Sequence, residues 1–205
     1  MLIVLAFVGI YIVRTVVSVA VQGVSDGSGM QYVKEWAAMF KNPMMWLNIA
    51  ALPINYFFVF IAFFGEEYGW RYYLQPVLQK RFGLRAGVII LGVVWGLWHI
   101  PDDLFYYTQT SGIQMIFAQQ ITCISLGIFF AYAYMKTQNI WVPVCLHYLN
   151  NNLIPIISGT FSADVLENQT VSWKDLPVAL VLNGLCFGFF LLADVFKKKE
   201  VQEEE

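Results

Sequence analysis

The sequence predicts an all-α protein, a polytopic transmembrane helix bundle with about six spanning helices. Hydrophobic residues make up 59% of the 205-residue chain, and charged residues make up only 13%. Soluble domains carry about 25% charged residues, so the composition argues against a soluble or disordered chain. Apolar runs close to the ~20 residues that a spanning helix needs recur along the sequence. We therefore expect residues 1–205 to form one domain embedded in the bilayer of the cell membrane.

The expected spans are six segments in which charged residues are rare. They run over about residues 2–21, from 45 into the 60s, 84–100, 113–135, 140–159 and 177–196, and a charged tail follows at 197–205. The first segment contains Arg14 but has no basic start. It is also too long for the apolar core of a signal peptide, which predicts a retained span. Each of the later segments is an apolar run bounded by polar or charged loops.

The second segment continues past the length of one span. Helix over residues 45–80 would reach about 54 Å at 1.5 Å per residue, well beyond the hydrocarbon core of a bilayer. A bend or break is therefore expected near Pro53 or Pro76, because proline removes a backbone donor and clashes with the preceding turn. Residues 65–75 are predicted to be helical and to run toward the cytoplasmic boundary.

The basic residues of the loops predict an orientation. Seven fall in loops on one side and three on the other: Lys80, Arg81, Arg85, Lys136 and Lys197 to Lys199 against Lys34, Lys41 and Lys174. The positive-inside rule then places both termini in the cytoplasm.

Charge and cysteine usage exclude other classes of protein. A net charge of −2 does not fit a strongly basic nucleic-acid binder. Cys123, Cys145 and Cys186 lie in apolar runs without CxxC spacing, so neither a zinc knuckle nor a disulfide framework is indicated. We interpret the three thiols as small apolar fillers.

Polar side chains inside the apolar runs are informative, because an ionisable group at the centre of a bilayer costs about 2.5–3.5 kcal/mol on insertion scales. Glu67 and Arg71 are i and i+4, so they share a helix face and are expected to pair. Glu66 projects elsewhere and is left free, which suits a general base. The same residues would also fit a salt bridge at a helix end on the membrane surface.

The two histidines of the chain, His99 and His147, lie at the end of one apolar run and inside another. Asn151 follows His147 by one helical turn, and an imidazole beside a carboxamide makes a plausible pair of oxyanion donors. Asn150 and Asn152 are expected to point to other faces. Each histidine alone would also fit a structural role.

A zinc site is the alternative for the same residues. Glu66, His99 and His147 would be the ligands, drawn from three separate helices. The helical zinc motif HExxH is absent. The sequence leaves metal dependence open, and we expect that no cofactor is required.

In their order these clusters resemble the CPBP family of intramembrane proteases. That family contains the type II CAAX prenyl endopeptidases and bacterial proteins linked to bacteriocin self-immunity. Its pattern is EExxxR, then an aromatic residue four before a histidine, then HxxxN or HxxxD. Here it reads Glu66-Glu67…Arg71, Trp95…His99 and His147…Asn151. Phe is the commoner aromatic at the position of Trp95, and the resemblance covers about residues 54–158.

The resemblance implies a conical catalytic cavity inside the membrane and an endopeptidase activity. By the family pattern, Glu66 and His99 activate water, His147 and Asn151 stabilise the oxyanion, and Glu67 and Arg71 support them. We expect the four catalytic side chains to line one cavity nearer the cytoplasmic face. The family is often labelled metalloprotease, but these side-chain roles are complete without a metal.

The expected partners are a membrane-associated protein or peptide substrate and the lipid bilayer, with no nucleic acid. The sequence specifies neither the substrate, nor its prenylation, nor the oligomeric state. One alternative is a non-catalytic immunity or scaffolding protein of the same fold. Another is a transporter with a buried proton relay, for which the expected repeat with paired broken helices is not evident.

Overall fold

The computed structural model describes residues 1–27, 29–158 and 166–197. The fold is all-helical over these ranges, as the composition predicts, and no strand occurs in them. The charged tail expected at 197–205 lies outside the described residues except for Lys197. In chain order the elements are α1 (Leu2–Asp26), α2 (Gly29–Lys41), α3 (Pro43–Glu67), η1 (Tyr68–Leu74), α4 (Gln75–Phe82), α5 (Leu84–Trp98), α6 (Ile100–Phe105), α7 (Gly112–Thr137), α8 (Trp141–Ser158), α10 (Asp175–Cys186), η2 (Gly188–Leu192) and η3 (Asp194–Phe196).

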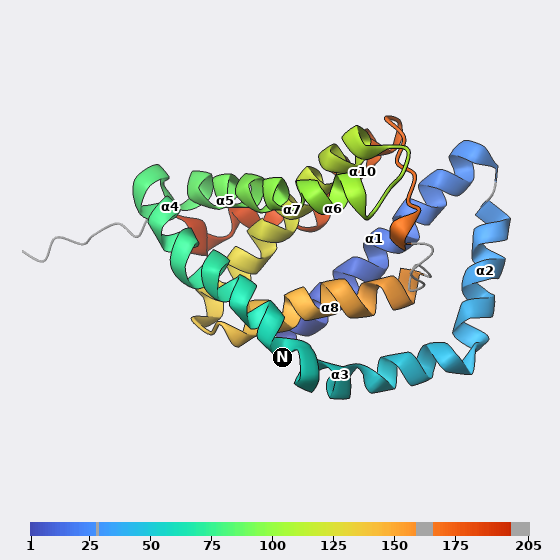
Figure 1. Cartoon of the computed structure of the whole chain (residues 1–205), viewed down its shortest axis with the longest axis horizontal. Helices are drawn as coiled ribbons and strands as arrows, with labels where there is room; N and C mark the ends of the chain where they lie inside the picture. Colours follow the sequence, from blue (N-terminus) through green and yellow to red (C-terminus); the bar gives the residue numbers. More distant parts are fainter. Residues whose placement is uncertain (28, 159–165, 198–205) are drawn as a thin grey trace, which may run out of the picture.

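Four helical stretches of the described chain are long and apolar enough to cross a membrane. They are Leu2–Val21, Pro43–Phe82, Leu84–Phe105 and Gly112–Thr137. The fifth expected span is present as α8, an 18-residue helix whose histidine and three consecutive asparagines lower its hydropathy. The molecule is a polytopic helical membrane bundle (Figure 1).

The continuous helix expected over 177–196 is not formed. The α-helix α10 ends at Cys186, and two short 3₁₀ turns, η2 and η3, follow it. The ring of Phe187 contacts Phe7 of α1 and Phe129 of α7, and Phe190 also packs on Phe129. Aromatic packing against two neighbouring helices therefore determines this end of the chain, rather than the length of the apolar run.

The long second segment is divided near the place that its length predicts. Pro53 lies inside α3, and Pro76 lies in the first turn of α4. Between α3 and α4 the chain forms η1, a π-helix of seven residues. Figure 1 shows the stretch from α3 to α4 changing direction as it wraps around one side of the molecule. Before it, α2 joins α1 to α3 as a short helix that the sequence analysis did not predict.

The site is positioned by a core in which α1, α5, α7 and α8 meet. Phe7, Trp95, Phe130 and Leu146 are buried in one cluster there. α5 and α7 approach closely because Gly92 faces α7: a Cβ on it would lie 2.6 Å from the Cα of Ile124. Small residues of this kind allow membrane helices to pack backbone against backbone. α8 in turn packs against α3 and α1.

Candidate active site

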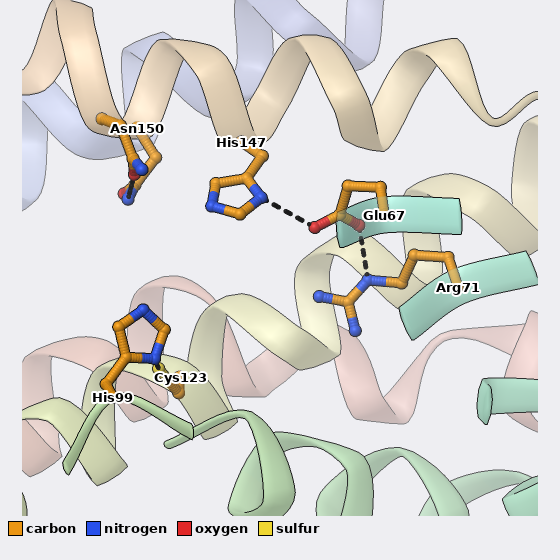
Figure 2. A network of polar contacts seen from close by, with 7 residues as sticks. Glu67, Arg71, His99, Cys123, His147 and Asn150 are labelled. Atoms are coloured by element: carbon orange, nitrogen blue, oxygen red, sulfur yellow. Dashed lines mark hydrogen bonds and ion pairs between the residues drawn. The ribbon is translucent and has the colours of Figure 1, made fainter. Parts of the chain in front are cut away.

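The centre of the polar interior is Glu67, the last residue of α3. Its Oε2 accepts a hydrogen bond from Nε of Arg71 at 2.9 Å, and its Oε1 lies 2.9 Å from Nδ1 of His147 (Figure 2). All three side chains are buried. The expected pairing of Glu67 with Arg71 is present. The second partner, His147 on α8, lies 80 residues further along the chain, and helical spacing gave no signal for it.

The π-helix η1 carries Arg71 past this carboxylate. The N–H of Gln75 donates to the carbonyl of Trp70, five residues earlier, at the end of η1. Pro76 follows directly and lacks an N–H, so an α-helix through this point would lose a hydrogen bond and clash with the preceding turn. The wider π turn accommodates that position, and such turns occur frequently at functional sites.

The Arg71 guanidinium lies between aromatic rings as well as against Glu67. Its Cζ is 5.2 Å from the ring centroid of Trp95 and 5.5 Å from that of Phe130. Its two terminal nitrogens are buried and have no hydrogen-bond partner among the described residues. Cation–π attraction and one short ion pair therefore hold this buried cation.

His147 is oriented by Glu67 and by the rings around it. Edge-to-face contacts with Phe63 and Trp95 have centroid separations of 5.2 and 5.4 Å. An ionised carboxylate can only accept a hydrogen bond, so the contact with Glu67 places a proton on Nδ1. Figure 2 shows the other ring nitrogen, Nε2, turned away from Glu67 and toward Asn150.

His99, the residue that ends α5, is held in the same tautomer by a different contact. Its Nδ1 lies 2.8 Å from the backbone carbonyl of Trp95 and 3.7 Å from Sγ of Cys123. Because the carbonyl can only accept, Nδ1 is the donor and Nε2 of the neutral ring keeps its lone pair. A nitrogen in this state can take a proton from a bound water.

The two histidines face one cavity of about 400 Å³. Sixteen residues line it: Tyr11, Trp95, His99, Tyr106, Tyr107, Gln119, Thr122, Cys123, Leu126, His147, Asn150, Asn151, Ile154, Pro155, Leu166 and Gln169. Three of the four expected catalytic residues, His99, His147 and Asn151, are therefore brought together.

Glu66 differs from the other three. It is partly exposed, and it is not among the residues that line the cavity. Its carboxylate interacts electrostatically with Cys123, the residue that contacts His99. No hydrogen bond or ion pair engages Glu66 within the described ranges. The contacts therefore separate the two glutamates as expected: Glu67 is paired, and no hydrogen bond or ion pair among the described residues engages Glu66.

The asparagines of α8 depart from the expectation. Asn150 was expected on another face, but it lines the cavity beside Asn151 and donates from Nδ2 to Oδ1 of Asn151 at 2.8 Å. Its own Oδ1 accepts from the hydroxyl of Tyr11 on α1. A hydrogen bond between neighbouring side chains draws the two amides to one side of the helix. Asn152 instead donates to the backbone carbonyl of Tyr148, outside the cavity.

No sequence pattern indicated the polar cavity residues that come from other elements. Tyr11 lies in an apolar span without a recognisable motif, and Tyr107 lies in the loop after α6. Burial, and then the charges of Asp102 and Asp103, raise the pKa of Tyr107 to about 12. Its phenol therefore stays neutral at physiological pH and adds an uncharged hydroxyl to the cavity wall.

The residues of the cavity do not gather as a metal site. Nowhere in the part of the chain that the structure describes do three or more His, Cys, Asp or Glu side chains come close enough to hold one ion. Glu66 in particular lies outside the cavity wall. The ligands of the alternative zinc interpretation, Glu66, His99 and His147, therefore do not come together as a tetrahedral centre, which needs at least three protein donors.

The class of protein that this architecture fits, a helical membrane bundle whose two imidazoles face one polar cavity, is the CAAX protease family. The family model of Rce1-like type II CAAX prenyl endopeptidases matches residues 48–153, and the chain belongs to this family. The match includes α5 and α7 and most of α3 and α8, close to the 54–158 stretch that carries the motifs. The resemblance found in the sequence is therefore confirmed.

One curated relative is CAAX prenyl protease 2 of Methanococcus maripaludis. The two sequences are 27% identical over 125 residues, which cover 57% of this chain and 45% of the relative. The chain thus matches less than half of the relative's length. No solved structure matches the chain.

Proposed function

We propose that the protein is an intramembrane endopeptidase that hydrolyses a peptide bond of a membrane-associated substrate with a water activated by Glu66 and His99. The observation that carries this proposal is the pair of histidines whose Nε2 atoms face one cavity. The tautomer of each is set by a contact at Nδ1. Family membership supports the general activity.

In the proposed reaction a water bound near His99 attacks the carbonyl carbon of the scissile bond. The proton that leaves this water passes to Nε2 of His99 or to the Glu66 carboxylate, and a C–O bond forms. Because Glu66 lies outside the cavity wall, it would share this proton through one bridging water; its carboxylate is suited to do so because no hydrogen bond or ion pair engages it within the described chain. The paired carboxylate of Glu67 has both oxygens occupied.

The developing oxyanion is stabilised from α8. Asn151 offers amide N–H donors, because its Oδ1 already accepts from Asn150. His147 can donate from Nε2 only as the doubly protonated ring, because the neutral ring keeps its one proton on Nδ1; the Glu67 carboxylate at Nδ1 would compensate the charge of that ring. When the tetrahedral intermediate collapses, the C–N bond breaks and the proton held by His99 or Glu66 passes to the leaving amine.

The proposed route uses no metal. A prenylated C-terminal peptide is the first substrate to test, because the curated relative is named a CAAX prenyl protease. A leader peptide or another segment of a membrane protein is the second. Both are membrane-associated chains, which fits a cavity enclosed by membrane helices.

The test is cleavage of these peptides by purified protein in detergent or liposomes, followed by mass spectrometry of the products. We expect wild-type protein to cleave at one bond and Glu66→Ala to bind the peptide without cleaving it. A matched control is Glu35→Ala, since Glu35 lies on α2 and accepts an exposed hydrogen bond from Gln31, one helical turn earlier. Equal cleavage by wild type and Glu66→Ala would refute the proposal.

A further inference from the structure

We propose that Tyr11 and Asn150 are positioning residues that fix the direction in which the Asn151 amide faces the substrate. This inference rests on the proposed function. It extends the site to α1, which lies outside the residues that the family model matches.

A chain of two hydrogen bonds leads from α1 to the cavity. The hydroxyl of Tyr11 donates to Oδ1 of Asn150 at 2.5 Å, and Nδ2 of Asn150 donates to Oδ1 of Asn151 at 2.8 Å. All three residues line the cavity. Because Oδ1 of Asn151 is engaged by Asn150, the end of its amide that remains for a substrate is the NH₂ group, which can only donate.

The direction of this chain matters because a carboxamide has two unlike ends. A reversed Asn151 would present its carbonyl oxygen to the cavity, and an oxygen lone pair would repel the developing oxyanion. Asn150 alone does not choose between the two directions, since its amide can be reversed together with that of Asn151. Tyr11 determines the direction. A phenol hydroxyl is a better donor than acceptor, so its hydrogen bond goes to the amide oxygen of Asn150.

Tyr11 is itself held firmly. Its side chain is 4% exposed. Its ring lies edge-on to Phe7 at 5.1 Å and is also 5.1 Å from the ring of Phe187, which follows α10. Packing from two elements thus fixes the ring, and the ring fixes its hydroxyl. These contacts persist when only the oxygen is removed, so Tyr11→Phe isolates the hydrogen bond from the packing.

The test is a double-mutant cycle on peptide cleavage, with kcat and KM measured for wild type, Tyr11→Phe, Asn151→Ala and the double variant. We expect Tyr11→Phe to lower kcat roughly 3- to 10-fold, the worth of one net hydrogen bond, with KM nearly unchanged. In the Asn151→Ala background the same substitution should change kcat by less than about twofold, because no amide remains to be oriented.

The matched control is Tyr148→Phe. The Tyr148 hydroxyl is also buried and hydrogen-bonded, to the carbonyl of Leu52 and to Asn55, but it does not line the cavity. Its removal is expected to lower thermal stability and to leave kcat within about twofold of wild type, as the loss of one neutral hydrogen bond outside the cavity predicts.

Four outcomes decide the inference and the function on which it rests. Tyr11→Phe with the kcat of Tyr148→Phe would overturn it, and so would independent, multiplying losses from Tyr11→Phe and Asn151→Ala. A wild-type protein that cleaves none of the peptides would overturn the proposed function itself. Cleavage by wild type with a coupled loss in Tyr11→Phe supports both.

Discussion

The polar groups on the two sides of the His147 ring differ in whether they are paired with each other or face a cavity. On the Nδ1 side, Glu67 and Arg71 are fully buried and bind each other, and aromatic rings cover the guanidinium. On the Nε2 side, the ring nitrogens of two histidines and the amide of Asn151 face a cavity. The first side contains a buried ion pair. The second side presents hydrogen-bond donors and acceptors to the cavity. Substitutions on the first side should therefore act mainly on folding, and those on the second mainly on catalysis.

The largest expected effect is on the paired side. Arg71→Ala leaves a buried carboxylate without one of its two partners, and breaking a buried ion pair in this way costs about 3–5 kcal/mol. We expect a large loss of folded protein, measured as monodisperse yield in detergent and as the midpoint of thermal unfolding. Arg81→Ala is the control, because Arg81 is exposed on α4, where its guanidinium lies over the ring of Phe82. Equal yields of the two variants would show that the ion pair does not stabilise the fold.

A smaller effect of a different kind is expected on the cavity side. Asn151→Ala removes one neutral donor, and loss of an oxyanion-hole donor lowers kcat about 10²–10³-fold. The thermal midpoint should change little, since the amide faces a cavity. Asn152→Ala, one residue further on α8 and outside the cavity wall, should retain kcat. A stable, fully active Asn151→Ala protein would remove Asn151 from the mechanism.

The smallest expected effect is that of metal removal. Treatment of the purified enzyme with a chelator should leave the cleavage rate within about twofold, because the proposed roles are complete in side chains. Rates are compared before chelation, after it and after zinc is added back. Reproducible inactivation with rescue by zinc would reverse the assignment, because a required metal couples activity to its own binding, and both histidines would then be ligands.

Contacts between residues that are close in the sequence could be predicted from it. Glu67 and Arg71 are four residues apart, and their pairing follows from helix geometry. The apolar runs predicted the all-helical fold, and three spaced motifs predicted the family. The cytoplasmic placement of both termini remains a prediction.

The rest depends on contacts between distant segments. The bond from His147 to Glu67 and the bond from Tyr11 to Asn150 join helices that are 80 and 139 residues apart, and periodicity within a helix carries no information about them. The π-helix at Tyr68–Leu74 arises where Pro76 and the packing of Arg71 act together. The early end of α10 likewise follows from aromatic packing on α1 and α7.

The central claim is that the two adjacent glutamates have different roles: Glu67 stabilises the fold, and Glu66 takes part in the reaction. The most direct test is to measure thermal unfolding and kcat side by side for Glu66→Gln and Glu67→Gln, since each change removes one charge and keeps the shape of the side chain. The account predicts that Glu66→Gln unfolds within about 1 kcal/mol of wild type and does not cleave. Glu67→Gln should be destabilised by about 3–5 kcal/mol, because the buried Arg71 cation loses its counter-charge. An active Glu66→Gln protein, or a Glu67→Gln protein as stable as wild type, would contradict it.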